Sequence, residues 1–231
     1  TGYTGTLTIT GSYTVADIKA LEASTLNYVL SNKAQALEVE NTGTNVADLV
    51  TALTGTGYKG NVTVTGTTAV ALADLKALNN LTTGKITLNT ASKEEDYSGA
   101  LDDLLAAFAG ITGLKGDITV ATGVPSIAEL KALNKSIDGT ITVTAATTLE
   151  GSAKDLIEAL KDVTLTDGTI KVNGAVTLAQ ILELQSKVDT ATDVTFTNPS
   201  AALTGTTADI LNALKSAPAP ADYKGAIKVT D

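Results

Sequence analysis

The side chains that could do chemistry in this sequence are carboxylates, amines and hydroxyls. Its 231 residues include 25 Asp and Glu and 16 basic residues, all of them Lys, and no His, Cys, Met or Trp. A thiol nucleophile, a histidine base and thiolate or imidazole metal ligands are therefore excluded. The net charge of −9 argues against a nucleic-acid partner, because affinity for phosphates depends on clustered cations.

The most regularly spaced carboxylates are candidates for acid–base catalysis, but their spacing indicates helix capping. An acid, or in one case Gln, follows a hydroxyl or amide residue by three positions, which is typical of a capping box at the start of a helix. The pairs are Thr14 with Asp17, Asn45 with Asp48, Ser126 with Glu129, Ser152 with Asp155, Thr177 with Gln180 and Thr206 with Asp209. Asp74 and Asp103 follow Ala71 and Ala100 in the same way. We predict no catalytic residue and no enzymatic activity.

Two further motifs suggest ligands. Lys93-Glu94-Glu95-Asp96 is an acidic cluster that could hold calcium, but it lacks the spacing of an EF-hand and we interpret it as a solvated loop. Gly55-Thr-Gly57-Tyr-Lys-Gly60 matches the dinucleotide-binding pattern, yet a helix is expected before it and a strand after it, the reverse of the required order. It predicts a helix end followed by a turn, and we expect no cofactor.

One short element recurs nine times along the chain. In each copy apolar and polar residues alternate with period two and many are β-branched, which predicts a half-buried strand. The copies are residues 5–10, 36–40, 60–65, 84–89, 116–121, 139–144, 168–173, 193–197 and 225–230.

Between these strands a second element recurs, with apolar residues at the i, i+3 and i+4 spacing of a short amphipathic helix. Two kinds alternate and give a double repeat. We call A-type the helices predicted at residues 15–21, 72–78, 127–133 and 178–184, of the Lys-Ala-Leu kind. We call B-type those at 46–53, 100–108, 153–160 and 207–214, of the Leu-x-x-Ala-Leu kind.

The strand–helix order predicts parallel strands joined by right-handed crossovers, with all helices on one face. We therefore expect a one-sided α/β solenoid of about eight strand–helix repeats, similar in plan to leucine-rich repeats but without their signature. Residues 1–231 would form a single repeat domain, four double repeats plus one extra strand. Because strands lie about 4.8 Å apart and helices 8–10 Å apart, either the sheet curves or alternate helices are staggered.

The outward face of the predicted sheet is rich in Thr and is the candidate binding surface. One row would hold Thr8, Thr63, Thr87, Thr119, Thr142 and Thr195, and the next Thr10, Thr65, Thr144, Thr197 and Thr230. The residues we assign to binding are Thr8, Thr10, Thr63, Thr65, Thr142, Thr144, Thr195 and Thr197. Flat rows of this kind suit an ordered ligand surface, including ice, although Glu38, Glu40, Lys171 and Lys228 interrupt them with charge. Thr is also simply a good strand residue.

The predicted array begins and ends on strands without polar caps, whereas a free-standing solenoid needs capping repeats. Exposed strand edges favour pairing with another chain. We therefore expect the partners to be the chain itself or neighbouring repeats of a longer array, with a surface glycan or protein as a further candidate. No apolar run is long enough for a membrane span.

Residues 64–88 and 117–160 carry tandem units of the form Gly-x-Ile-Thr-Val-Thr followed by Leu-Ala-x-Leu-Lys-Ala-Leu-Asn. Such units resemble the strand–helix repeat arrays of very large surface or secreted proteins of marine bacteria and cyanobacteria. The resemblance covers essentially the whole chain and implies an extracellular or cell-surface scaffold or adhesive role. The leading hypothesis is a non-enzymatic structural module of a fibre, layer or adhesin, and the alternative is a ligand- or ice-binding solenoid.

Overall fold

A computed structural model describes the chain except for residues 1–2, 25, 44, 188–191, 197–201 and 216–224. It has a mixed α/β fold, and in the described residues the neighbouring strands whose register is defined are parallel. The chain divides into two compact units, one made of Thr1–Tyr97 with Asp102–Gly116 and the other of Ser98–Leu101 with Asp117–Asp231. The single continuous array of residues 1–231 stays a prediction.

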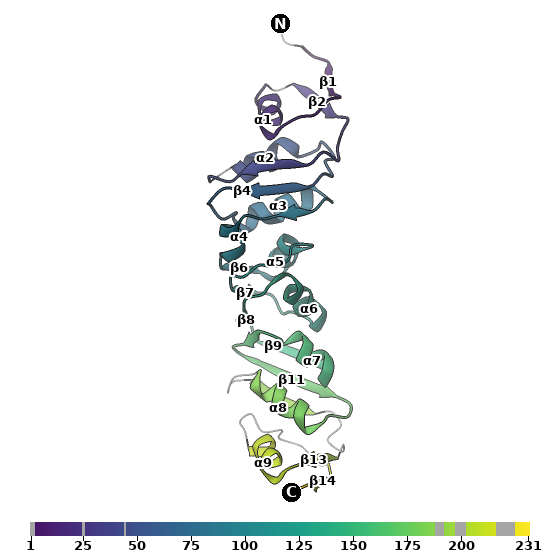
Figure 1. The fold of residues 1–231 in the computed structure, drawn as a ribbon. Coiled ribbons are helices and arrows are strands. Elements are labelled where there is room, and N and C mark those ends of the chain that lie inside the picture. The colour runs from purple at the N-terminus through teal and green to yellow at the C-terminus, as the bar shows by residue number, and fades with distance from the viewer. Residues whose placement is uncertain (1–2, 25, 44, 188–191, 197–201, 216–224) are drawn as a thin grey trace. The chain divides into compact units, whose positions relative to one another are not determined.

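The described residues form nine helices, labelled in Figure 1. Their bounds are α1 Val15–Ala23, α2 Asn45–Leu53, α3 Leu72–Leu81, α4 Thr90–Glu94, α5 Leu101–Phe108, α6 Ile127–Ser136, α7 Ala153–Ala159, α8 Leu178–Ser186 and α9 Thr207–Lys215. The A-type helices are therefore α1, α3, α6 and α8, and the B-type helices are α2, α5, α7 and α9. None of the described helices is long and apolar enough to cross a bilayer.

The strands outnumber the nine expected copies. Their bounds are β1 Thr6–Ile9, β2 Asn27–Leu30, β3 Leu37–Glu40, β4 Val62–Thr65, β5 Ile86–Thr87, β6 Tyr97–Ala100, β7 Ile118–Thr122, β8 Ile141–Val143, β9 Thr147–Ser152, β10 Val163–Leu165, β11 Gly168–Asn173, β12 Thr192–Phe196, β13 Leu203–Gly205 and β14 Ile227–Val229. Five short sheets contain them, none of which closes into a barrel within the described residues.

The sheets follow one rule. We call β1, β4, β7, β11 and β14 the A strands, because each precedes an A-type helix or occupies the same place in the repeat. Between two successive A strands the chain forms one strand that pairs back to the first and another that pairs forward to the second. Between β7 and β11 it also forms β10, which pairs with β8 and not with an A strand. The resulting orders are β1-β2, β3-β4-β5, β6-β7-β8-β10, β9-β11-β12 and β13-β14. An A strand is thus flanked on both sides in the three middle sheets and on one side only in the first and last.

The expected pairing of consecutive copies is confirmed for β3 with β4, β4 with β5, β7 with β8 and β11 with β12, and is wrong for the other copies. Gly168 in β11 pairs with Thr147 of β9, a segment without the strand motif, and not with the copy that begins at Gly139. The copy at 139–144 instead lies in another sheet, where Ile141 pairs with Val163 of β10. Pairing partners lie 21 residues apart in the first case and 22 in the second, closer than the 25–31 residues that separate successive helix starts. Consecutive copies pair where they are 23–25 residues apart, as Ile118 with Ile141, and do not pair where more residues separate them, as between the copies that begin at Gly139 and Gly168.

The division of the strands among several sheets also affects the expected mismatch between the spacing of strands and the spacing of helices. Within each double repeat the chain leaves one sheet and enters the next. The strands therefore form several short sheets and not one continuous ladder along the chain. The helices therefore need not follow a continuous strand spacing of about 4.8 Å.

The expected alternation of burial is confirmed in the flanked A strands. Val62 and Val64 of β4 are buried while Thr63 is half-buried, and α7 packs on both β9 and β11 (Figure 1). The terminal A strands differ. Leu7 of β1 is 36% exposed although it occupies the place of Val62, which is 0% exposed. A flanking strand, and not the residue type alone, therefore completes the core.

Helix capping is confirmed at most of the predicted positions. Thr14, Ser126 and Thr177 form complete capping boxes, while Ser152 and Thr206 accept from the N–H three residues later. Ala71 caps α3 without a side-chain hydrogen bond. Asn45 differs from the prediction: it is the first residue of α2, and its amide nitrogen donates to the carbonyl of Glu40 at 2.6 Å.

The acidic segment at residues 93–96 was expected to be a solvated loop, which is correct in part: Glu94, Glu95 and Asp96 are exposed, and Glu95 and Asp96 lie between a helix and a strand. Lys93 and Glu94 end the short helix α4, and β6 begins at Tyr97. Asn89 starts this helix by accepting from the N–H of Ser92 at 2.9 Å. The hydroxyl of Tyr97 donates to the carbonyls of Val70 at 3.0 Å and Ser92 at 3.1 Å, which ties the segment to the core.

Candidate functional site

The structure distributes the candidate threonines over four sheets. Thr8 lies in β1 with Thr10 just after it, and Thr63 and Thr65 lie in β4. Thr142 lies in β8 with Thr144 directly after that strand, and Thr195 lies in β12. Thr197 is outside the described residues. The expectation of two rows running along one continuous sheet is wrong, because the ladder is interrupted at each double repeat.

Shorter rows do form within single sheets. Thr119, Thr142 and Thr164 stand opposite one another across β7, β8 and β10, and Thr63 stands opposite Thr87. Thr164 was missed by the sequence analysis because β10 lacks the strand motif. Hydroxyls at the strand ends are turned to the neighbouring backbone. That of Thr144 donates to the carbonyl of Val120 at 3.0 Å, and that of Thr166 to Val143 at 3.1 Å.

The carboxylates do not assemble into a metal site in the described part of the chain, where no group of three His, Cys, Asp or Glu side chains could hold an ion. They serve instead as helix caps and as partners of lysines. The lysine pairs link the two helices in three of the four double repeats.

A polar bridge between the A-type and B-type helices recurs at fixed positions. Two residues after the third position of an A-type helix, a Lys pairs with the Asp at the third position of the following B-type helix. Lys19 bonds Asp48 at 2.8 Å, Lys76 bonds Asp103, and Lys131 bonds Asp155 at 2.8 Å.

A second contact lies one turn further along the same helices. A side-chain amide of the A-type helix donates to the carbonyl of an Ala near the end of the B-type helix. Asn79 donates to Ala107 at 3.2 Å, Asn134 to Ala159 at 3.0 Å and Gln185 to Ala213 at 2.8 Å. Helix ends leave carbonyls without internal partners, so this contact satisfies groups that would otherwise need water.

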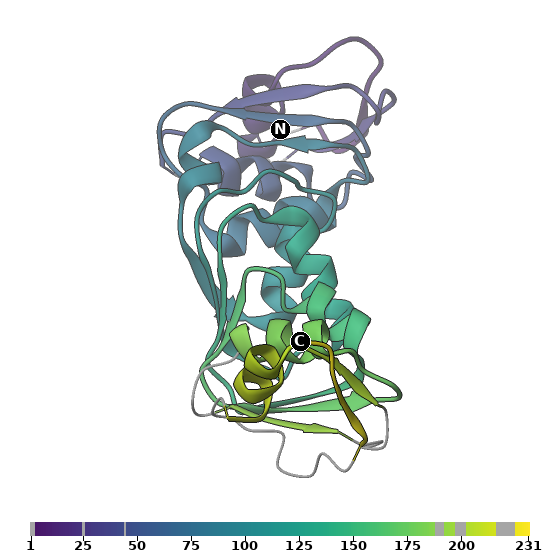
Figure 2. The same cartoon turned by 60° about the horizontal axis from the view of Figure 1, so that its bottom comes forward.

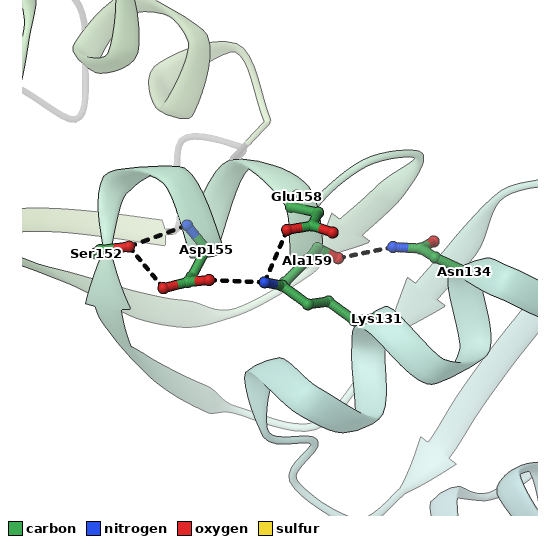
Figure 3. A network of polar contacts seen from close by, with 6 residues as sticks. All are labelled: Lys131, Asn134, Ser152, Asp155, Glu158 and Ala159. Atoms are coloured by element: carbon green, nitrogen blue, oxygen red, sulfur yellow. Dashed lines mark hydrogen bonds and ion pairs between the residues drawn. The ribbon is translucent and has the colours of Figure 1, made fainter.

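Figure 3 shows the fullest bridge, between α6 and α7. Lys131 contacts both Asp155 and Glu158, the latter at 2.9 Å, and Asp155 also accepts from the hydroxyl of its cap Ser152 at 2.7 Å. The hydrogen bond from Lys131, and then that from Ser152, lower the pKa of the Asp155 carboxyl. The same two carboxylates raise the pKa of Lys131.

Two helix pairs depart from the full pattern. Glu22 occupies the amide position in α1, and there the hydroxyl of Tyr28 donates to the equivalent carbonyl, that of Ala52. Leu182 replaces the Lys in α8, so the pair α8–α9 keeps the amide contact from Gln185. Sequence analysis found the alternation of the helices but missed the bridge. The recurring Lys and Asn, each placed at a constant distance from the capping acid, were the signal.

Asn134→Ala is expected to lower the free energy of unfolding by about 1 kcal/mol, the usual contribution of one hydrogen bond. The change removes the donor to Ala159 while leaving the apolar face of α6 unchanged. Urea unfolding followed by circular dichroism measures it. The matched control is Lys135→Ala at the next, exposed position of α6. Equal urea midpoints for the two variants would show that the hydrogen bond from Asn134 does not contribute to the free energy of unfolding.

The chain is expected to lose stability in acid. Hydrogen bonds from Ser126 lower the pKa of Glu129, and those from the N–H and hydroxyl of Thr140 lower the pKa of Asp117. Groups with a lowered folded pKa stabilise fully above their unfolded values, about 4, and that stability is lost as pH falls through the folded values. Urea midpoints from about pH 6 to pH 2 should therefore fall mainly below about pH 4. Asp117→Asn should show a smaller fall, and a flat profile would contradict the assignment.

The two terminal sheets carry exposed apolar residues at positions that the middle sheets bury. Tyr3 is 62% exposed, whereas Tyr58 at the same position of the next A strand is 2% exposed. In β14, Ile227 is 47% and Val229 is 53% exposed. Figure 2 brings this C-terminal end forward, with α9 and the pair β13–β14.

Comparison with known proteins found no protein-family model, no curated protein and no solved structure that matches this chain.

Proposed function

We propose that this chain is a non-enzymatic structural module of an extracellular or cell-surface fibre, layer or adhesin. In this proposal it forms an α/β solenoid of four A–B double repeats plus one extra A strand. The observation that carries the proposal is the inter-helix bridge. Its amide contact recurs between equivalent residues in three helix pairs, from Asn79 with Ala107 to Gln185 with Ala213, and in the first pair Tyr28 of β2 contacts the equivalent Ala52.

The bridge supports a structural role because the polar residues that recur most regularly in the sequence contact other residues of the chain. The helix-start carboxylates of Asp48, Asp103 and Asp155 each contact a lysine of the preceding A-type helix. A repeat whose regular polar residues join it to its neighbour is suited to stacking in an array, in which each repeat contacts only the adjacent ones.

Imaging of the producing cells tests this role. Gold-labelled antibodies against the purified chain should mark fibres or layers outside the cell, and negative-stain images of the same material should show the label at regular intervals. Label confined to the cell interior would overturn the proposal.

A ligand-binding face is the second candidate, supported by the in-register row of Thr119, Thr142 and Thr164. Replacing Thr142 by Lys would introduce a charge in the middle of this row. If the face orders ice, the purified chain should shape ice crystals and the variant should lose that effect. If the chain at high concentration neither shapes ice nor binds glycans, the second candidate would be overturned and only the structural role would remain.

A further inference from the structure

We infer that Asn173 is a site of spontaneous covalent modification, at which the backbone nitrogen of Gly174 displaces the side-chain amide and leaves aspartate or isoaspartate. Asn173 is the last residue of β11, and Gly174 is the first residue after that strand. Among the Asn residues of the sequence, only Asn173 is followed by Gly. The inference goes beyond the proposed structural role and does not depend on it.

The reaction needs only the chain and water. The nitrogen of Gly174 loses its proton to solvent and bonds to Cγ of Asn173, the Cγ–Nδ2 bond breaks, and ammonia leaves with that proton. The product is a cyclic imide. Water then opens the ring at Cγ, which gives aspartate, or at the main-chain carbonyl carbon, which gives isoaspartate with the chain running through the former side chain. Each conversion consumes a water and releases ammonia, and nothing is oxidised or reduced.

The attacking nitrogen of Gly174 is accessible. Gly174 is exposed, and a Cβ built on it would meet no atom within 4 Å. Its φ of +80° lies in the left-handed region that favours glycine. Between described residues no hydrogen bond uses its N–H. A residue without a Cβ therefore presents its nitrogen to the preceding side chain with little steric hindrance.

The side chain that is attacked is also accessible. Asn173 is exposed, and its amide nitrogen donates to Oε1 of Glu150 at 3.2 Å. A hydrogen bond between exposed groups exchanges readily for bonds with water, so the amide can turn from Glu150 toward Gly174. Asn89 is the contrast, because it is 8% exposed and its amide nitrogen donates to three carbonyls.

Asn61 shows that exposure of the amide is not sufficient. It is exposed like Asn173, but its Oδ1 accepts from the N–H of Lys85 at 2.8 Å. The nitrogen that would attack it belongs to Val62, a β-branched residue, and donates to the carbonyl of Lys85 at 3.0 Å. Because both reacting groups are held in the sheet, we expect Asn61 to stay intact.

The modification would weaken the contact between β9 and β11. Asn173 lies opposite Ser152, the cap of α7, at the end of the ladder that joins these strands. Conversion replaces an amide that donates to Glu150 by a carboxylate that can only accept, so a hydrogen bond between two strands becomes repulsion between like charges. Isoaspartate also lengthens the main chain by a carbon atom at this point.

Mass spectrometry of the folded chain tests the site. The purified chain is kept in native buffer at mildly alkaline pH for several weeks and digested after Lys, with a sample from the start as the reference. The peptide of residues 172–187, whose only Asn is Asn173, should gain about 1 Da, the difference between an amide and an acid, and separate into two isomers. The peptide of residues 60–76, whose only Asn is Asn61, should keep its mass.

Two variants test the chemistry. Asn173→Thr gives β11 the Thr-Gly pair that residues 10–11 and 65–66 carry at the same place in the repeat, and it should abolish the mass gain. Gly174→Ala keeps the amide but adds a methyl group beside the attacking nitrogen, and it should slow conversion at least about tenfold. Circular dichroism verifies that each variant is folded.

The effect on the sheet is tested with Asn173→Asp, which imitates the aspartate product. It should lower the urea midpoint more than Asn173→Thr, because both variants lose the amide donor and only the first adds a charge beside Glu150. Equal midpoints for these two variants would overturn the weakening of the contact between β9 and β11.

A folded chain whose peptide of residues 172–187 keeps its mass would overturn the inference, even if a urea-unfolded sample converts, because the fold would then protect Asn173. Equal conversion of Asn61 and Asn173 would contradict the roles given to the hydrogen bonds of Asn61 and Val62. An unchanged rate in Gly174→Ala would show that the nitrogen of Gly174 is not the attacking group.

Discussion

Gly60→Ala is expected to lower the free energy of unfolding by at least about 2 kcal/mol, the range of overpacked interiors. A Cβ at this position would lie 2.0 Å from the carbonyl oxygen of Gln35 in the preceding turn of chain. That carbonyl accepts from the hydroxyl of Tyr58 at 2.7 Å, so moving it away would break a buried hydrogen bond. The φ of Gly60 is not in the left-handed region, so the loss would come from the contact and not from backbone strain.

The control is Gly5→Ala at the same position of the first A strand. A Cβ there would meet the ring of Tyr3, an exposed side chain that can turn away. Its stability should change by no more than about 0.5 kcal/mol. Urea midpoints for the two variants measure the difference, and equal midpoints would contradict this account of the strand glycine. A Cβ added at Gly84 or Gly116 would lie equally close to a carbonyl oxygen of the preceding turn, 2.2 Å from that of Gly60 and 2.0 Å from that of Glu95, so these positions should behave like Gly60.

Asn89→Ala is expected to cost about 3 kcal/mol. The side chain is 8% exposed, and its amide nitrogen donates to the carbonyls of Thr65 at 3.3 Å, Gly66 at 3.0 Å and Thr68 at 2.9 Å. Its oxygen also caps α4 through Ser92. Loss of the cap contributes about 1 kcal/mol, and leaving buried carbonyls without a donor contributes about 1–3 kcal/mol.

The matched control is Asn80→Ala on the exposed face of α3. It should change the urea midpoint little, because surface substitutions away from special contacts stay within about 0.5 kcal/mol. An effect of Asn89→Ala no larger than that of Asn80→Ala would show that the turn at residues 65–68 does not depend on this amide.

The helices and the motif-bearing strands could be predicted because their signals are local. Thr14 and Asp17, or Ser126 and Glu129, contact each other three residues apart, so a capping box is complete within one turn of helix. The alternation of Val62 and Val64 with Thr63 likewise states which face of a strand is apolar. The helix α4 had such a signal in Asn89, which the acidic run after it obscured.

The bridge between the helices could be predicted only in part. Lys131 and Asn134 stand at constant distances from Glu129, and the same spacing recurs from Asp74 to Lys76 and Asn79. The periodicity of these residues was visible, but their partners Asp155 and Ala159 lie about 25 residues away. Only the packing of one helix on the next shows that they meet.

The sequence by itself determined where helices and period-two strands form, because their hydrogen bonds and apolar faces depend on residues a few positions apart. Tertiary structure alone decided that β11 pairs with β9, that Thr142 stands beside Thr164, and that Leu7 is exposed where Val62 is buried. The physical reason is that parallel pairing and burial are properties of two segments brought together. Equivalent residues in successive repeats therefore share a conformation but not a neighbour.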